Sequence, residues 1–395
     1  MTTALQSPWE RLYLPMALWR SRSRLAAMRA SNALPRVALV KQDCNEDLYC
    51  CSPETGPLEM LRSTLLRSGP IGLFTTFDAR FFIVKTEADP ECSVWKEKSD
   101  PLQWAPLSWF EAFRDRVPGR GHGQSHFALG VDEIDWSEFD LVVSVDGAVP
   151  KRIADRHQGV VWAYYVREIK APSWNSSFER PLAGQDLYLD HCFDPFPPRR
   201  AGHVVHVPYH FQRSGIFHEL AGLPVLGENG EGRRGVFVEY HTARQAEPGQ
   251  LRQLEEFGPV YAKRIEDDRF DPDTGERIPQ RSMDQEGFAA LTNSKYHVKW
   301  DGRAIYGTAK IDAIAAGCLA LSDTERDGSS FMQSKATRVS GFESLLAALR
   351  RLEASESLYR RELRRQRDLV DYLCYYRPAN QLIDAWQRAR QRKNP

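Results

Sequence analysis

The sequence predicts an α/β protein of two domains, each built on a parallel sheet. Three observations carry that prediction. A chain of 395 residues is longer than one hydrophobic core usually organises. Short apolar runs alternate with helix-like stretches, as they do where helices join parallel strands. Residues 221–235 are rich in glycine and charge without periodicity, which is typical of a linker between domains.

The first segment, residues 1–32, is basic and helical in character. It mixes tryptophan, leucine and methionine with repeated arginines, and Pro15 should break or kink any helix there. Two interpretations stay open. Residues 1–30 could lie on an anionic membrane surface as an amphipathic segment. They could equally form a helix that packs against the protein's own body, since such helices also carry arginines.

The N-terminal domain is expected over residues 33–220, and short apolar runs mark its strands. The first is "RVALVKQD" at 36–43, a β-branched run followed by a polar loop, as in a parallel sheet. Helices are expected between several of the runs, for example at 57–68 and 105–116. Further strands are predicted at 71–77, 81–85, 140–147, 159–166 and 203–210.

The C-terminal domain is expected over residues 236–375. Its strands are predicted at 235–242, 257–265, 294–300 and 318–323. From about 342 to 390 the pattern is helical, with leucines at 345, 346, 349 and 352 on one helical face. The charged stretch 267–277 lacks the spacing of a calcium loop and is expected to form a hairpin.

Composition excludes several classes of function. Lysine plus arginine equals aspartate plus glutamate at 53 each, so no overall field favours nucleic acid as a partner. The seven cysteines lack metal-ligand spacing and indicate reduced thiols in a cytoplasmic protein. No apolar run is long enough to span a membrane. No Walker motif occurs, and no GxGxxG follows the first strand, which argues against a nicotinamide dehydrogenase.

The most informative stretch is "GTAKIDAIAAGCLALSD" at 307–323. Gly307 allows a tight turn, Thr308 is a plausible N-cap, and Gly317 should end the helix before a buried strand. Asp312 falls four residues after Thr308, on the same helical face. A helix N-terminus suits a phosphate, and an acid one turn in can bind ribose hydroxyls. Alternatively, Asp312 completes a local cap network.

Residues 294–323, "SKYHVKWDGRAIYGTAKIDAIAAGCLALSD", resemble the donor-binding segment of GT-B glycosyltransferases, with exostosin-like and group-1 patterns nearest. The resemblance implies two Rossmann-like domains with parallel sheets facing a cleft. It also implies that a C-terminal helix, residues 376–395, returns to the N-terminal domain. The C-terminal domain would hold the nucleotide-sugar, and the N-terminal domain the acceptor. The resemblance implies catalysis without a metal. It implies no other cofactor either, since the nucleotide-sugar is a substrate.

The chain departs from the family pattern at two positions. The helix acid is Asp312 where relatives usually carry glutamate, and Ala304 stands where many have a second glutamate. The group that touches the donor sugar is therefore missing or comes from elsewhere. The candidate donor-binding residues are Arg244, Lys295, Lys299, Gly307, Thr308, Lys310 and Asp312. In relatives an arginine and a lysine follow early strands of this domain, and Arg244 and either Lys263 or Arg264 lie at about those positions. Each cation taken singly could instead be a solvated surface group.

Four residues are candidates for catalysis. Asp43 and Glu46 follow the first strand, and Glu239 and His241 end the first strand of the C-terminal domain. An acceptor hydroxyl needs a base, or a retaining reaction needs a carboxylate near the anomeric carbon. The loop with Asp43 and Glu46 could also be merely solvated. A zinc site at His203, His206 and His210 is not expected, since their spacing fits neither helix nor strand.

The sequence therefore predicts a metal-independent glycosyltransferase of bacterial surface polysaccharide synthesis, acting on a glycan or lipid-linked acceptor. Its expected location is the cytoplasm, or the inner face of the membrane as a peripheral protein. Two alternatives stay open: a nucleotide-sugar epimerase on the same scaffold, and a non-catalytic nucleotide- or sugar-binding protein. An epimerase would need acids and histidines around the sugar ring and would use no acceptor.

Overall fold

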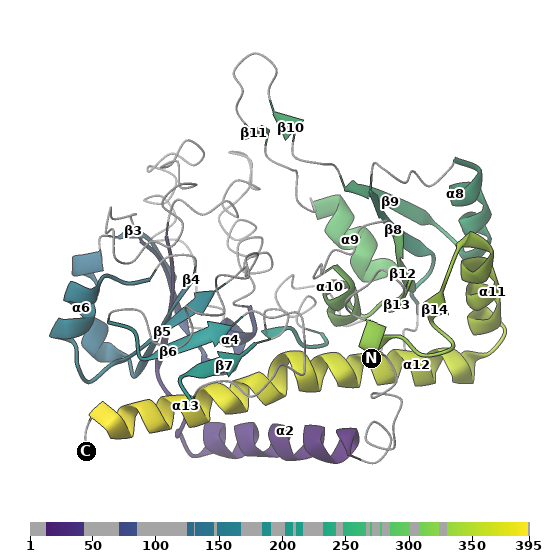
Figure 1. Ribbon diagram of the computed structural model, residues 1–395. Helices are drawn as coiled ribbons and strands as arrows, with labels where there is room; N and C mark the ends of the chain where they lie inside the picture. The colour runs from purple at the N-terminus through teal and green to yellow at the C-terminus, as the bar shows by residue number, and fades with distance from the viewer. Residues whose placement is uncertain are drawn as a thin grey trace. The chain divides into compact units, whose positions relative to one another are not determined.

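The chain divides into two compact units, shown in the computed structural model of Figure 1. The seven-stranded unit comprises Arg20–Phe211 with Leu373–Pro395, and the five-stranded unit comprises Met1–Trp19 with Gln212–Tyr372. The structure describes residues 13–42, 71–84, 125–129, 131–145, 148–166, 184–190, 202–207, 211–215, 232–241, 248–265, 269–270, 277–278, 285–300, 309–323 and 330–393.

The seven-stranded unit contains a parallel sheet of order β3-β2-β1-β4-β5-β6-β7. Its strands are β1 (Val37–Gln42), β2 (Arg80–Val84), β3 (Ser125–Leu129), β4 (Leu141–Val145), β5 (Val161–Val166), β6 (Leu187–Asp190) and β7 (Val204–His206). The described helices of this unit are α4 (Ile71–Phe77), α6 (Lys151–Arg156), α13 (Arg377–Lys393), the larger part of α2 (Leu14–Ala30), and the 3-10 turns η3 (Val131–Glu133) and η4 (Trp136–Glu138).

Both faces of this sheet are buried, because alternate residues of each strand enter different cores. Leu39 and Val143 pack with Leu382 and Trp386 of α13 on one face. The other face of β4 contributes Val142 to a second core with the residues of η3, η4 and α6. The predicted return of the C-terminal helix to the first sheet is therefore confirmed.

The five-stranded unit has a parallel sheet of order β14-β13-β12-β8-β9. Its strands are β8 (Val236–His241), β9 (Val260–Ile265), β12 (Tyr296–Trp300), β13 (Leu319–Asp323) and β14 (Arg338–Val339). Its helices are α8 (Pro248–Leu254), η8 (Glu255–Phe257), α9 (Gln285–Asn293), α10 (Ala309–Ala316), η9 (Ser330–Met332), α11 (Phe342–Glu353) and α12 (Glu356–Val370). A π-helical turn, η10 (Asp371–Tyr376), follows α12 and leads into α13.

The predicted α/β class with two separate parallel sheets is confirmed. The hairpin at 267–277 is also confirmed, since β10 (Arg269–Phe270) pairs antiparallel with β11 (Arg277–Ile278). The predicted helices 57–68 and 105–116 lie outside the described residues. So does most of the proposed linker, of which the structure describes residues 232–235.

One predicted strand is wrong. Residues 71–77 form helix α4, although their apolar and β-branched composition favours a strand. The Thr76 hydroxyl donates to the Gly72 carbonyl one turn earlier, and it also contacts the Tyr375 hydroxyl. Asp78 then adopts a left-handed conformation, with φ of 51°, which ends the helix before β2. Strands β3 and β6 had not been predicted.

Helix α2 packs on the protein through one face, as one of the two interpretations required. Leu14, Leu18 and Leu25 are buried along that face. The Asn380 side chain of α13 donates to the Ser21 carbonyl at 3.2 Å, and Arg24 forms an ion pair with Asp384. Pro15 lies in the first turn of the helix, where proline is tolerated. Among the described helices, none is both long and apolar enough to cross a membrane.

Candidate functional site

One face of the five-stranded sheet carries a row of polar side chains near the carboxyl ends of its strands. Glu239 of β8 pairs in register with Lys263 of β9 and Lys299 of β12. Lys299 in turn pairs with Ser322 of β13. Paired residues of a parallel sheet point to the same face. Lys263, Glu239, Lys299 and Ser322 therefore form a continuous row, which we call the polar row.

The opposite face of the same strands is apolar. Val238, Val298 and Leu321 enter a core with Leu345 and Leu349 of α11. This alternation fixes the side on which the polar row lies, since a shift of one residue would place the lysines in the core. The apolar core thus holds the polar row in place.

Aromatic rings lie next to the polar row, one layer nearer the amino ends of the strands. Phe237 stacks on Tyr261 with ring centroids 4.9 Å apart and on His297 at 5.8 Å. Burial lowers the pKa of His297 to about 4, against the opposing effect of Glu239. At neutral pH the imidazole is therefore uncharged, and the positive charge of this site resides on its lysines.

Glu239 is the buried carboxylate of the row, with 5% of its surface exposed. Its Oε1 lies 3.6 Å from Lys263 Nζ, and its Oε2 lies 3.9 Å from His297 Nε2. Within the described residues, Oε2 accepts no hydrogen bond. Buried carboxylate oxygens normally have a donor. Glu239 therefore has acceptor capacity to offer to a hydroxyl or an amide.

Helix α10 adds a third lysine to the site. Lys310 is fully buried, and its Nζ donates to Ser322 Oγ at 3.1 Å. Lys299 is only 7% exposed. The surface interpretation of these two cations is therefore excluded. Lys263, Lys299 and Lys310 thus gather beside Glu239, and a cluster of lysine side chains suits an anion.

Asp312 lies on the same helix and is partly buried. Its Oδ1 accepts a hydrogen bond from Gln212 Nε2 at 3.1 Å. The Gly215 amide also donates to the Ala315 carbonyl at 3.0 Å, so residues 212–215 are attached to α10 at two points. Gly317 ends the helix as predicted, with φ of 102°. Asp312 therefore has a structural partner in addition to any ligand.

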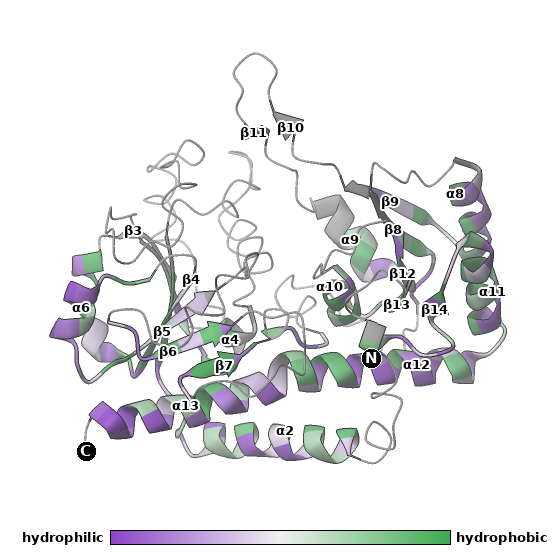
Figure 2. Cartoon of the chain, in the orientation of Figure 1, coloured by the Kyte–Doolittle hydropathy of each residue, from purple (hydrophilic) through white to green (hydrophobic). Residues whose placement is uncertain are grey.

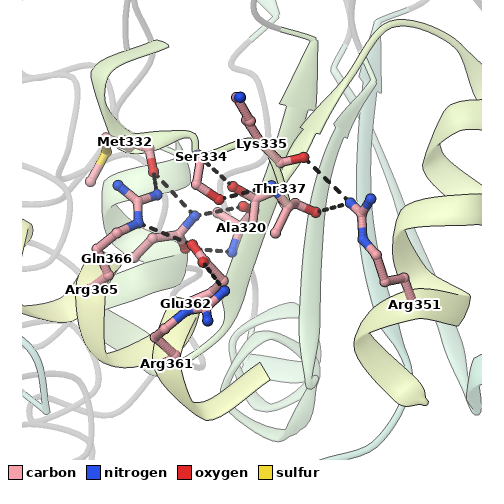
Figure 3. A network of polar contacts seen from close by, with 11 residues as sticks. Ala320, Met332, Ser334, Lys335, Thr337, Arg351, Arg361, Glu362, Arg365 and Gln366 are labelled. Carbon is pink, nitrogen blue, oxygen red and sulfur yellow. Dashed lines mark hydrogen bonds and ion pairs between the residues drawn. The ribbon is translucent and has the colours of Figure 1, made fainter. Parts of the chain in front are cut away.

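Side chains of α12 form hydrogen bonds with β13, the strand that carries Ser322 (Figure 3). Strand β14 pairs only with Ser322 and Asp323, which leaves the edge of β13 open at Ala320. The Gln366 side chain completes that edge: its Oε1 accepts from the Ala320 amide at 2.9 Å, and its Nε2 donates to the Ala320 carbonyl at 2.8 Å. Arg365 bonds the Met332 carbonyl and Glu362. These contacts fix β13 two residues before Ser322.

The structure brings together three of the predicted site residues, Glu239, Lys299 and Lys310, and places Asp312 on the helix that carries Lys310. It separates Lys295 from them. Lys295 precedes β12 at the amino end of the sheet, where its Nζ pairs with Glu353 at 2.7 Å. His241 ends β8, but its side chain lies outside the described residues, as do Asp43, Glu46, Arg244, Gly307 and Thr308.

Sequence reasoning missed two members of the site, His297 and Ser322. Alternation in "YHVKW" puts His297 on the same face as Lys299, so the signal was present. It also missed a buried pair in the other sheet. Asp190 ends β6 and pairs in register with His206, the last residue of β7. The four-residue strand β6 was too short to be recognised by its pattern.

The buried imidazole predicts a pH-dependent stability. Because the pKa of His297 is about 4 in the folded chain and ordinarily about 6.5, the unfolded chain binds a proton first as pH falls. Stability is then complete above pH about 6.5 and is lost progressively below it. We expect the unfolding free energy to fall by about 2 kcal/mol between pH 7 and pH 5 from this group alone. Urea unfolding of His297→Leu should lack that slope; an unchanged slope would contradict the assignment.

Metal ligands are not gathered in the described part of the chain. No group of three or more histidine, cysteine, aspartate or glutamate side chains there could hold a metal ion. Cys318 and Cys374 are buried and form no disulfide. Burial raises the pKa of the Cys318 thiol to about 11, so this cysteine is protonated at neutral pH.

Comparison with known proteins gives similarity at the level of whole chains only. No family model and no curated protein matches the chain. Among solved structures, T4 phage beta-glucosyltransferase with UDP and Mn2+ is 11% identical, with 90% of this chain and 99% of that chain covered and a TM-score of 0.37. Anabaena HepE with UDP is 9% identical, with 88% of this chain and 98% of that chain covered and a TM-score of 0.39. Sucrose-phosphate synthase from Thermosynechococcus elongatus is 12% identical, with 89% of this chain and 98% of that chain covered and a TM-score of 0.36. Similarity this weak carries no argument about activity.

Proposed function

We propose that this protein is a glycosyltransferase that moves a sugar from a nucleotide-sugar donor to a glycan or lipid-linked acceptor. The single observation that carries the proposal is the lysine-rich polar row at the carboxyl ends of β8, β9, β12 and β13, beside α10. Ligands of open α/β sheets bind at that end of the strands. The GT-B donor motif of the sequence, residues 294–323, supplies β12, α10 and β13.

In this proposal, the lysines and Asp312 hold different parts of the donor. Lys299 and Lys310 carry the positive charge that a diphosphate requires, while Asp312 accepts from the ribose hydroxyls. Transfer forms a bond from the acceptor oxygen to the anomeric carbon and breaks the bond from that carbon to the diphosphate. Negative charge then develops on the departing nucleotide, where the lysine ammonium groups stabilise it.

The acceptor proton needs a base, and the donor sugar needs a partner for its hydroxyls. The proposed groups are Asp43 and Glu46 for the proton, and Glu239 and His241 beside the sugar. Glu239 is supported by its buried Oε2, which has no donor among the described residues. We place the reaction at the inner face of a bacterial membrane, in surface polysaccharide synthesis, and we propose that it needs no metal.

A ligand screen tests the proposal. The purified chain is mixed with each common nucleoside diphosphate, and its melting temperature is measured. We expect a rise with one base, since a ligand that binds the folded state stabilises it. The matching nucleotide-sugar is then incubated with and without glycan or lipid-linked acceptors. Acceptor-dependent release of the nucleoside diphosphate supports transfer. Epimerisation without an acceptor would support an epimerase, and binding without turnover a non-catalytic protein.

A further inference from the structure

Helix α2 presents an unusual outer face. Tyr13, Met16 and Trp19 are 51%, 41% and 66% exposed, and they are the exposed large hydrophobic side chains of the described chain. Single exposed apolar residues are normal on protein surfaces. Tyr13 directly before the helix, together with Met16 and Trp19 in its first two turns, forms a patch. The inner face of α2 is already occupied by its buried leucines.

One stripe along the outer face of α2 lacks charge. Met16, Trp19, Ser23, Ala26 and Ala30 follow one another at steps of three and four residues, and all are exposed. This stripe lies opposite the buried leucines of the helix. A surface helix ordinarily turns charged residues to solvent on that side. Here the centre of the solvent-facing side is apolar or small, so it is suited to a partner rather than to water.

Arginines flank this stripe on both sides. Arg20 lies on one side of it, Arg22 and Arg29 lie on the other, and all three are exposed. Helix α2 contains no aspartate or glutamate. Although the chain as a whole is neutral, this helix is therefore strongly cationic.

Helix α13 extends the positive charge. It runs beside α2, and its one acid, Asp384, forms an ion pair with Arg24 (Figure 2). Arg388 and Arg392 follow Asp384 at intervals of four residues on the same face, and both are exposed. Beyond the ion pair, the side of α13 next to α2 thus adds further cations.

We propose that this outer face of α2, with its flanking arginines, binds the surface of an anionic lipid bilayer. Met16 and Trp19 would enter the headgroup region, while Arg20, Arg388 and Arg392 would contact lipid phosphates. An apolar centre with cationic flanks fits a bilayer better than nucleic acid, whose phosphates require charge across the contact. The surface deepens the proposed membrane location but does not depend on sugar transfer.

Sedimentation of the full chain with vesicles tests the proposal. One set of vesicles contains phosphatidylcholine alone, and the other contains an equimolar mixture with phosphatidylglycerol. We expect binding to the anionic set only, weakened by added salt. Met16→Ser with Trp19→Ser should lower the affinity about tenfold or more. Arg20→Ser should lower it about fivefold.

The control variant is Arg252→Ser, which removes an exposed arginine from α8 and should leave vesicle binding unchanged. All the substituted side chains are exposed, and equal melting temperatures will verify that each variant is folded. The proposal is overturned if the chain does not sediment with anionic vesicles, or if Arg20→Ser and Arg252→Ser act alike. It is also overturned if the chain binds a duplex DNA oligomer through the same arginines but does not bind vesicles. Sugar transfer to a soluble acceptor is assayed separately, so either idea can fail alone.

Discussion

Lys299→Met should weaken binding of the matched nucleoside diphosphate roughly ten- to a hundredfold and leave binding of the nucleoside nearly unchanged. The substitution removes a charge-assisted contact, worth about 1.5–3 kcal/mol, that only the phosphates make. Calorimetric titration of both ligands measures the difference. Sugar transfer should fall by at least the same factor, because negative charge increases on the diphosphate as the sugar departs.

The fold should tolerate this change. Lys299 is buried, and methionine has a similar length without the cost of burying a charge. Glu239 keeps its ion pair with Lys263. We therefore expect the unfolding free energy to change by no more than about 1 kcal/mol.

Lys295→Met is the matched control for Lys299→Met. It makes the same substitution at the opposite end of β12, where the lysine pairs with Glu353 and lies 4.6 Å from the Tyr359 ring centre. We expect a small loss of stability and normal nucleotide binding. If the two variants weaken the diphosphate equally, or if Lys299→Met alters stability alone, the polar row is not the diphosphate site.

The parts of the fold that follow from local pattern could be predicted. The strands around β4, β5, β8 and β12 are apolar runs whose composition and spacing suffice. Helix α4 could not be predicted in this way. The Thr76 hydroxyl of this helix forms a hydrogen bond with Tyr375, which is 299 positions away. Arg29 of α2 donates to the Thr76 carbonyl at 2.9 Å. Tertiary contacts decided that segment, and local composition favoured the wrong answer.

In the candidate site, too, features set by local pattern could be predicted and features set by tertiary contacts could not. The sequence placed Lys299, Lys310 and Glu239 at strand ends and a helix start, because those positions depend on local pattern. It could not show that Ser322 accepts from Lys310, or that His297 lies beside Glu239, since each contact joins separate elements. It also could not reveal Gln212, which is 100 residues from Asp312 in sequence. That contact makes the role of Asp312 an experimental question.

Asp312→Ala should weaken binding of the matched nucleotide by roughly ten- to a thousandfold if the carboxylate holds the donor ribose. One or two charge-assisted hydrogen bonds, each worth about 1.5–3 kcal/mol, would be lost. The effect should extend to the nucleoside, in contrast to Lys299→Met, because its target is the sugar. The alanine itself favours the helix, and loss of the bond to Gln212 should cost the fold about 1 kcal/mol.

Two further variants separate ribose binding from a structural role. Asp312→Asn keeps an oxygen that accepts from Gln212 but loses the negative charge, and Gln212→Ala removes the partner while Asp312 stays ionised. If Asp312 binds ribose, the asparagine variant should melt like the native chain and still bind nucleotide at least about fivefold more weakly. Gln212→Ala should bind more strongly than Asp312→Ala. If instead Asp312→Ala and Gln212→Ala lower the melting temperature equally and both bind nucleotide normally, the carboxylate serves to anchor residues 212–215 on α10, and the ribose must be held elsewhere.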